Sequence, residues 1–100
     1  MSLHLSKDAE QDIADIYVYS FEQFGEAKAE SYYQALIEHF DSLERNPAMG
    51  RDFSFVKTNV RRTNCVSHAV YYRVTGRDVL VLRVLHQSRD PARHLKFFGE

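Results

Sequence analysis

The feature that most constrains the fold of this chain is a change of hydrophobic period at Pro47. Before it, apolar side chains recur every three or four residues, which is the spacing of one helix face. The first stripe comprises Ala9, Ile13, Ile16, Tyr17, Ser20 and Phe24, and the second comprises Ala29, Tyr33, Leu36, Phe40 and Leu43. After Pro47, runs rich in β-branched and aromatic residues predict strands. The pattern therefore indicates an α+β domain whose helices precede most of its sheet.

Local signals set the expected ends of the two helices. The first is expected from about Lys7 to Phe24, because a serine before it, Ser6, offers an oxygen to a backbone N–H of the first turn. Gly25 is a natural left-handed stop. The second helix begins within a residue or two and ends before Pro47, because the residue before a proline leaves helical geometry. Two helices joined so tightly form an antiparallel hairpin.

Four segments have the composition of strands. Residues 3–5 alternate, residues 60–66 are polar and β-tolerant, and residues 69–74 and 79–85 are strong strand formers around a turn with one glycine. Residues 52–57 stay ambiguous. The expected order is β-α-α-β-β-β, with the helical hairpin packed on one face of a small, mainly antiparallel sheet. A short C-terminal helix or tail follows His86.

Length and composition narrow the class of protein. One hundred residues predict a single domain over residues 1–100 with one modest core. The longest apolar runs are four residues, far short of the roughly 20 that a membrane helix needs. The N-terminus has no apolar stretch of signal-peptide length, and a lone cysteine, Cys65, excludes an internal disulfide and a Cys-based zinc cluster. We therefore expect a cytoplasmic protein without membrane contact, metal or cofactor.

The charge is divided between the two halves of the chain. Residues 1–44 carry two basic and ten acidic residues, a net charge of −8, whereas residues 45–100 carry eleven basic and four acidic residues, a net charge of +7. The acids are expected on the outer faces of the helices, and the basic half is suited to an acidic partner or a phosphate backbone. Strand alternation places Arg61 and Arg62 on opposite faces of the sheet.

Arg83 interrupts the apolar run of the last strand. Burying it without a partner costs several kcal/mol, so either a carboxylate such as Asp90 pairs with it or it emerges on the open sheet face. The other candidates for chemistry are few. The sequence has no glycine-rich phosphate loop and no Gly-x-Ser-x-Gly elbow, and no two histidines stand at i, i+4 on a helix. Cys65 is expected to be buried, and the aromatic residues are expected mainly in the core, namely Tyr17, Tyr32, Tyr33, Phe40, Tyr71 and Tyr72.

Several motifs carry a resemblance to a known family. They are Asn46-Pro47-x-x-Gly50-Arg51, Arg61-Arg62, His68-x-Val70-x-Tyr72-Arg73, and Arg83-Val84-Leu85-His86 running into Arg89-Asp90 and Arg93-His94-Leu95. Over about residues 3–95 the chain resembles the ParE toxins of bacterial type II toxin–antitoxin modules, within the RelE/ParE superfamily. The resemblance implies a gyrase-inhibiting toxin that acts by binding and performs no chemistry. It also implies a ParD-like ribbon-helix-helix antitoxin as partner, through which alone the toxin meets DNA.

The residues expected to bind the antitoxin or gyrase are basic and lie in or just after the sheet, namely Arg62, Arg73, Arg83, His86, Arg89 and Arg93. No residue is expected to be catalytic. Two alternatives remain open. One is a RelE-like ribosome-dependent ribonuclease, although the arginine positions of such enzymes align with Ala69 and Gln87 here and the late tyrosine has no counterpart. The other is a paralogue that binds its antitoxin without being toxic.

Overall fold

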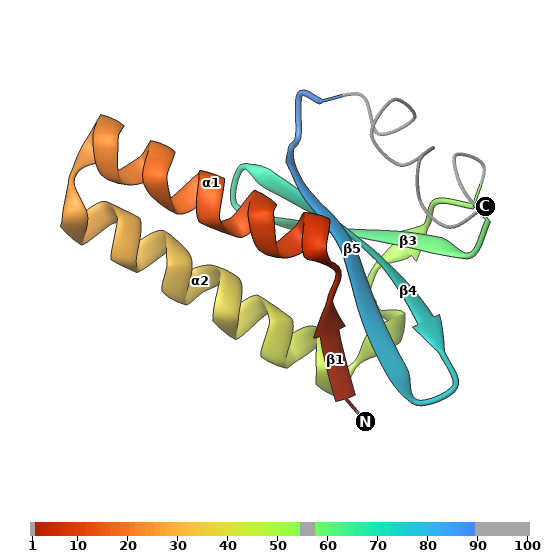
Figure 1. Ribbon diagram of the computed structural model, residues 1–100. Coiled ribbons are helices and arrows are strands. Elements are labelled where there is room, and N and C mark those ends of the chain that lie inside the picture. The colour runs from red at the N-terminus through yellow and green to blue at the C-terminus, as the bar shows by residue number, and fades with distance from the viewer. Residues whose placement is uncertain (1, 55–57, 90–100) are drawn as a thin grey trace.

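The computed structural model of the chain describes residues 2–54 and 58–89. Its elements are β1 (Ser2–Leu5), α1 (Lys7–Phe24), α2 (Glu26–Arg45), a 3-10 turn (Pro47–Met49), β2 (Arg51–Asp52), β3 (Val60–Cys65), β4 (His68–Thr75) and β5 (Asp78–His86). Figure 1 shows the two helices side by side on one face of the sheet. The predicted α+β class and the predicted order of the main elements are confirmed. The expected C-terminal helix or tail falls mainly on residues 90–100, outside the described residues.

The sheet has the strand order β1-β5-β4-β3-β2. β1 runs parallel to β5, with Leu3 opposite Val79, and every other pair is antiparallel. Parallel strands need a long crossover connection, and the elements between β1 and β5 supply it. β2 is an addition to the predicted order, since its two residues pair with Arg61 and Arg62 of β3. A strand of two residues has no alternation to detect, so residues 52–57 could not be assigned from sequence.

The predicted bounds of α1 are confirmed, and two residues explain them. Ser6 Oγ accepts the Ala9 backbone N–H at 3.0 Å and donates to the Leu82 carbonyl at 2.8 Å. One hydroxyl therefore caps the helix and fixes its start on β5. Gly25, at the joint with α2, has φ +91° and ψ 173°, a backbone conformation that is essentially restricted to glycine.

The main core lies between the helical hairpin and the sheet. Buried side chains of Leu36 and Leu43 from α2 meet Val79 and Val81 from β5. Tyr72 belongs to the same layer, and its hydroxyl donates to the Pro47 carbonyl at 2.6 Å and accepts the Gly50 N–H at 2.9 Å. A Cβ atom on Gly50 would lie 2.8 Å from the Tyr72 ring. The Asn46–Gly50 segment is therefore clamped onto β4 by close approach.

The face of the sheet away from the helices holds a second buried cluster. It comprises Phe53, Val60, Ala69, Tyr71, Leu82 and Leu85. The sequence predicted an open face here, and that prediction is wrong for these positions. A β-bulge contributes to the difference, because Tyr71 pairs with Arg83 while Tyr72 pairs with Val81, so Leu82 is an extra residue in β5. The extra residue changes the alternation of the strand, and apolar side chains occupy both faces.

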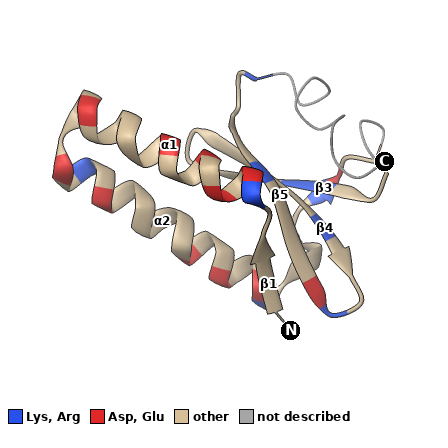
Figure 2. Ribbon diagram, in the orientation of Figure 1, with Lys and Arg blue, Asp and Glu red and all other residues tan. Residues whose placement is uncertain are grey.

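The charge separation in the sequence is also a separation in space. Figure 2 shows acidic residues along both helices, whereas seven of the ten Lys and Arg residues of the described chain lie on the strands or in the turns that follow them. The fold therefore places a largely acidic helical layer on a basic sheet, as the two net charges of −8 and +7 suggested. The aromatic prediction is only partly confirmed. Tyr71, Tyr72 and Phe40 are buried, but Tyr33 is 41% exposed.

Candidate partner-binding groove

A groove of about 760 Å³ lies between α1 and the end of the sheet where β4 begins and β5 ends. Its helical side presents Ile16 and Tyr19, and its sheet side presents His68, Val84 and His86. Figure 1 shows this end of β5 beside α1. The groove therefore has both apolar and polar walls.

An ion pair forms one wall of the groove. Asp12 accepts hydrogen bonds from Arg83 Nε at 2.7 Å and from Arg83 Nη2 at 2.8 Å. The same carboxylate accepts the backbone N–H of Val84 at 3.0 Å. These hydrogen bonds raise the pKa of the Arg83 guanidinium above its ordinary value. Of the two predicted alternatives for Arg83, pairing with a carboxylate is confirmed and emergence on the open sheet face is wrong. The partner is Asp12 on the first helix, whereas Asp90, the example given, lies outside the described residues.

A histidine pair lies at the base of the groove. His68 and His86 face each other across β4 and β5 with ring centroids 5.4 Å apart. The Tyr32 hydroxyl donates to the Cys65 carbonyl at 3.1 Å and is hydrogen-bonded to His68 Nδ1. Burial raises the pKa of Tyr32 to about 12, and burial, followed by the nearby His86, lowers the pKa of His68. The phenol therefore keeps its proton at neutral pH, and His68 resists gaining one.

His86 has hydrogen-bond partners of its own just beyond β5. Its Nδ1 atom accepts the Ser88 backbone N–H at 3.2 Å and lies 2.8 Å from Ser88 Oγ. An Nδ1 that accepts a backbone N–H leaves the proton of the neutral ring on Nε2. The pair thus offers a ring N–H from His86 to a bound segment. Arg89 is exposed beside it and also lines the groove.

Two other residues of the predicted binding set lie elsewhere. The Arg62 guanidinium lies 5.6 Å from the ring centroid of Phe53 and 5.5 Å from that of Tyr71, on the sheet face away from the helices. Arg73 pairs with Val60 on that same face and donates to the Thr58 carbonyl at 3.0 Å. Arg61 donates instead to the Gly50 carbonyl beside Tyr72, so the predicted opposition of Arg61 and Arg62 is confirmed.

The six basic residues therefore do not form one surface. Arg83, His86 and Arg89 line the groove, Arg62 and Arg73 lie on the other face of the sheet, and Arg93 is outside the described residues. Sequence reasoning missed the helical side of the groove, chiefly Asp12, Ile16 and Tyr19. A signal was present, because Tyr19 is a large aromatic residue outside the stripe that packs on the sheet. It is 61% exposed.

The described parts of the chain contain neither a cluster of metal ligands nor a helix suited to cross a membrane. In residues 2–54 and 58–89, no three His, Cys, Asp or Glu side chains gather into a group that could hold a metal ion. Neither described helix is both long enough and apolar enough to cross a membrane. Cys65 is buried as expected, and burial raises the pKa of its thiol.

The fold is shared with a solved toxin–antitoxin structure. A chain of a structure titled "Chromosomal ParDE TA system from P. aeruginosa" superposes with a TM-score of 0.76 at 24% sequence identity, covering 86% of this chain and 95% of that chain. At this identity the likeness defines the fold class: a helical hairpin on a mixed, mainly antiparallel sheet.

Sequence relatives make the assignment more specific. The family model described as "ParE toxin of type II toxin-antitoxin system, parDE" matches residues 3–91. The protein named Toxin ParE1 of Caulobacter vibrioides is 36% identical over 91 residues, covering 91% of this chain and 94% of that protein. The protein named Toxin ParE1 of Mycobacterium tuberculosis is 34% identical over 92 residues, covering 91% and 94%. The chain belongs to the ParE toxin family of type II toxin–antitoxin systems.

Proposed function

We propose that this chain inhibits DNA gyrase by binding to it and that a ParD-like antitoxin neutralises the toxin. The observation that carries the proposal is membership in the ParE toxin family over residues 3–91. The inhibition is a binding event, not a reaction on a substrate. The polar groups of the groove support this, because Arg83 is held by Asp12 and His86 Nδ1 is hydrogen-bonded with Ser88. The toxin acts in the cytoplasm, where gyrase and its DNA are found.

The antitoxin contributes a segment that lies in the groove between α1 and β5. Ile16, Tyr19 and Val84 offer it apolar contacts, while His86 and Arg89 offer donors to acidic side chains. Disordered segments that fold on binding make such contacts over an extended surface. The segment binds as an amphipathic chain and does not add a strand at Val84, because the Asp12 carboxylate already occupies that backbone N–H. DNA is reached only through the antitoxin.

The test of the proposed activity is a supercoiling assay with purified gyrase and relaxed plasmid. The toxin is expected to stop supercoiling and to accumulate cleaved DNA, and an equimolar amount of its cognate ParD-like antitoxin is expected to restore supercoiling. Full supercoiling at a large molar excess of folded toxin would refute gyrase as the target. Cleavage of ribosome-bound mRNA in a parallel reaction would instead support the ribonuclease alternative.

The test of the groove uses two matched pairs of variants. Tyr19→Ser and Arg89→Glu are expected to weaken antitoxin binding about tenfold or more, as the loss of a central interface contact commonly does. Met49→Ser and Arg77→Glu are the controls, because both residues are exposed and lie away from the groove. Calorimetry of each variant with the antitoxin gives the affinities. Equal affinities for Tyr19→Ser and Met49→Ser would show that the segment binds elsewhere, for example on the face of Arg62 and Arg73.

A further inference from the structure

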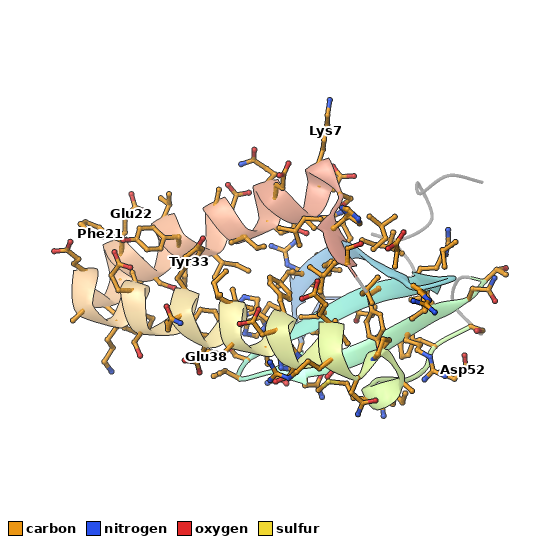
Figure 3. All side chains as sticks on the ribbon, turned by 90° about the horizontal axis from the view of Figure 1, so that it is seen from below. Lys7, Phe21, Glu22, Tyr33, Glu38 and Asp52 are labelled. Atoms are coloured by element: carbon orange, nitrogen blue, oxygen red, sulfur yellow. The ribbon has the colours of Figure 1, made fainter. Side chains whose placement is uncertain are left out.

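The helical hairpin carries a second apolar surface on the side turned away from the groove. We call it the outer patch and define it as Tyr17, Val18, Phe21 and Tyr33. Val18 is 53% exposed, Phe21 49% and Tyr33 41%. The Tyr17 ring lies 6.4 Å from that of Phe21 and 6.1 Å from that of Tyr33, so aromatic side chains of both helices form one cluster. Figure 3 shows Phe21 and Tyr33 on the same side of the hairpin.

The outer patch is distinct from the groove. Successive helical residues are rotated by about 100°, so Tyr19 and Phe21 point about 200° apart around α1. Tyr19 lines the groove, and Phe21 does not. A partner that fills the groove therefore leaves the outer patch available to a different protein.

A row of acidic residues runs through the outer patch and on along one face of α2. On α2 the residues at positions 26, 30, 33, 37, 41 and 44 share one face by their spacing of three and four, and four of the six are acidic: Glu26, Glu30, Asp41 and Glu44. Glu30 accepts a hydrogen bond from the Tyr17 hydroxyl at 3.0 Å. In the part of the chain that the structure describes, none of these four carboxylates forms an ion pair. Their charge is therefore available to a partner.

Charge selects the kind of partner. The same face of a second copy, an anionic lipid surface and a nucleic acid would each bring negative charge against the acidic residues, and like charges across an interface cost several kcal/mol. A basic protein surface with an apolar recess matches both properties of the patch. An enzyme that holds DNA necessarily presents such a basic surface, because it neutralises DNA phosphates with Lys and Arg.

We propose that the outer patch is the surface with which the toxin docks on its target, against a basic surface of gyrase. This inference rests on the proposed function, because it takes gyrase as the target. Phe21 and Tyr33 enter the apolar recess, and Glu26 and Glu30 meet basic side chains around it. The toxin has separate surfaces for antitoxin and target, the groove and the outer patch.

The experiment compares two variants on opposite sides of one helix. Phe21→Ser is expected to raise the toxin concentration needed for half-inhibition of supercoiling about tenfold or more, with antitoxin affinity within about twofold of wild type. Tyr19→Ser is expected to weaken antitoxin binding about tenfold or more and to leave the concentration for half-inhibition within about twofold of wild type. Circular dichroism confirms folding of both, and Tyr33→Ser provides an independent variant on α2 should Phe21→Ser fail to fold.

Two charge-reversal variants test whether the partner surface is basic. Glu30→Lys is expected to weaken inhibition, whereas Glu38→Lys makes the same charge change on the same helix at a position rotated by about 140° from Tyr33. Figure 3 shows Glu38 on α2, away from Phe21.

Three results would overturn the inference. Wild-type inhibition by Phe21→Ser and Tyr33→Ser excludes the patch. Parallel loss of antitoxin and gyrase binding in every variant indicates one shared surface. Self-association of the toxin that Glu30→Lys abolishes assigns the patch to a second copy, whose basic sheet would cover it.

A wild-type toxin that neither binds nor inhibits gyrase removes the proposed function and this inference with it. The wild-type protein therefore tests the proposed function. The variants test the outer patch, because they are compared only when the wild type inhibits gyrase.

Discussion

At the scale of single residues, the side chain that joins most parts of this molecule is Asp12. β1 pairs with β5 only as far as Val81, so the edge of β5 beyond that point has no neighbouring strand. An unpaired edge is a template for unwanted strand pairing. The Asp12 carboxylate accepts the Val84 N–H at this edge and both donors of Arg83, so it closes the edge and neutralises a partly buried cation at once.

Removing this carboxylate is expected to destabilise the fold. The Arg83 side chain is 20% exposed and would lose its partner in Asp12→Ala, along with the hydrogen bond to Val84. The expected loss is about 2–4 kcal/mol in the free energy of unfolding. Urea denaturation followed by circular dichroism measures it. Asp15→Ala, an exposed position on the same helix, is the control and should change stability by less than about 0.5 kcal/mol. Equal losses would contradict this role for Asp12.

The hydroxyl of Tyr72 is the second critical group at this scale. It joins the Pro47 carbonyl and the Gly50 N–H inside the core, and burial raises its pKa. Tyr72→Phe keeps the ring but leaves both backbone groups without this partner, which is expected to cost about 1–3 kcal/mol. Thermal unfolding of Tyr72→Phe beside Tyr19→Phe, whose ring is exposed, isolates the effect. An unchanged melting temperature for Tyr72→Phe would show that water replaces the hydroxyl.

At the scale of elements, the joint between the helices decides the shape of the hairpin. Gly25 ends α1, donates its N–H to the Phe21 carbonyl at 2.9 Å and starts α2 through its own carbonyl. A single residue between two long helices forces them antiparallel and brings Phe21 and Tyr33 onto one side. The groove and the outer patch both depend on this joint.

A substitution at Gly25 therefore tests the element directly. Nothing lies within 4 Å of a Cβ atom placed there, so only the backbone conformation opposes a side chain. Gly25→Ala is expected to lower the free energy of unfolding by about 1–3 kcal/mol. The control is Gly76→Asn in the β4–β5 turn, where φ is +61° and asparagine is tolerated. If Gly25→Ala unfolds at the same urea concentration as wild type, the backbone has relaxed without strain.

At the scale of the whole molecule, two half-buried histidines link stability to pH. Burial lowers the pKa of both His39 and His68 below the ordinary value of 6.5. A lowered pKa means that the unfolded chain binds more protons than the folded chain at acidic pH. The contribution of these two histidines to the free energy of unfolding is therefore fully present above about pH 6.5. It decreases as the pH falls below that value toward the pKa values of the folded state.

This linkage is expected to appear as a lower melting temperature at pH 5 than at pH 8. Because carboxylates also titrate on acidification, the specific test is a variant. His68→Gln is expected to reduce the difference in melting temperature between pH 7.5 and pH 5.5, and His4→Gln, at an exposed position on β1, is expected to retain the wild-type difference. Identical profiles for His68→Gln and wild type would assign the pH dependence to other groups.

Much of this architecture was determined by the sequence itself. The bounds of α1, the one-residue joint at Gly25, the end of α2 before Pro47 and the β4–β5 hairpin all follow from signals within a few residues of each boundary. Such signals act through local backbone sterics and hydrogen bonding, so they need no knowledge of the rest of the chain. The family resemblance also rests on short motifs of neighbouring residues, and the family model and the sequence relatives confirm it.

The tertiary structure decided what the charged and aromatic residues do. Asp12 and Arg83 meet although 71 positions separate them, and the extra residue Leu82 altered the alternation on which the predicted arginine surface depended. Helical rotation alone separates Tyr19 from Phe21, but the packing of the hairpin on the sheet decided which of them lines the groove. Local periodicity fixes which residues share a face of an element, but only long-range packing determines whether that face meets a core, a groove or solvent.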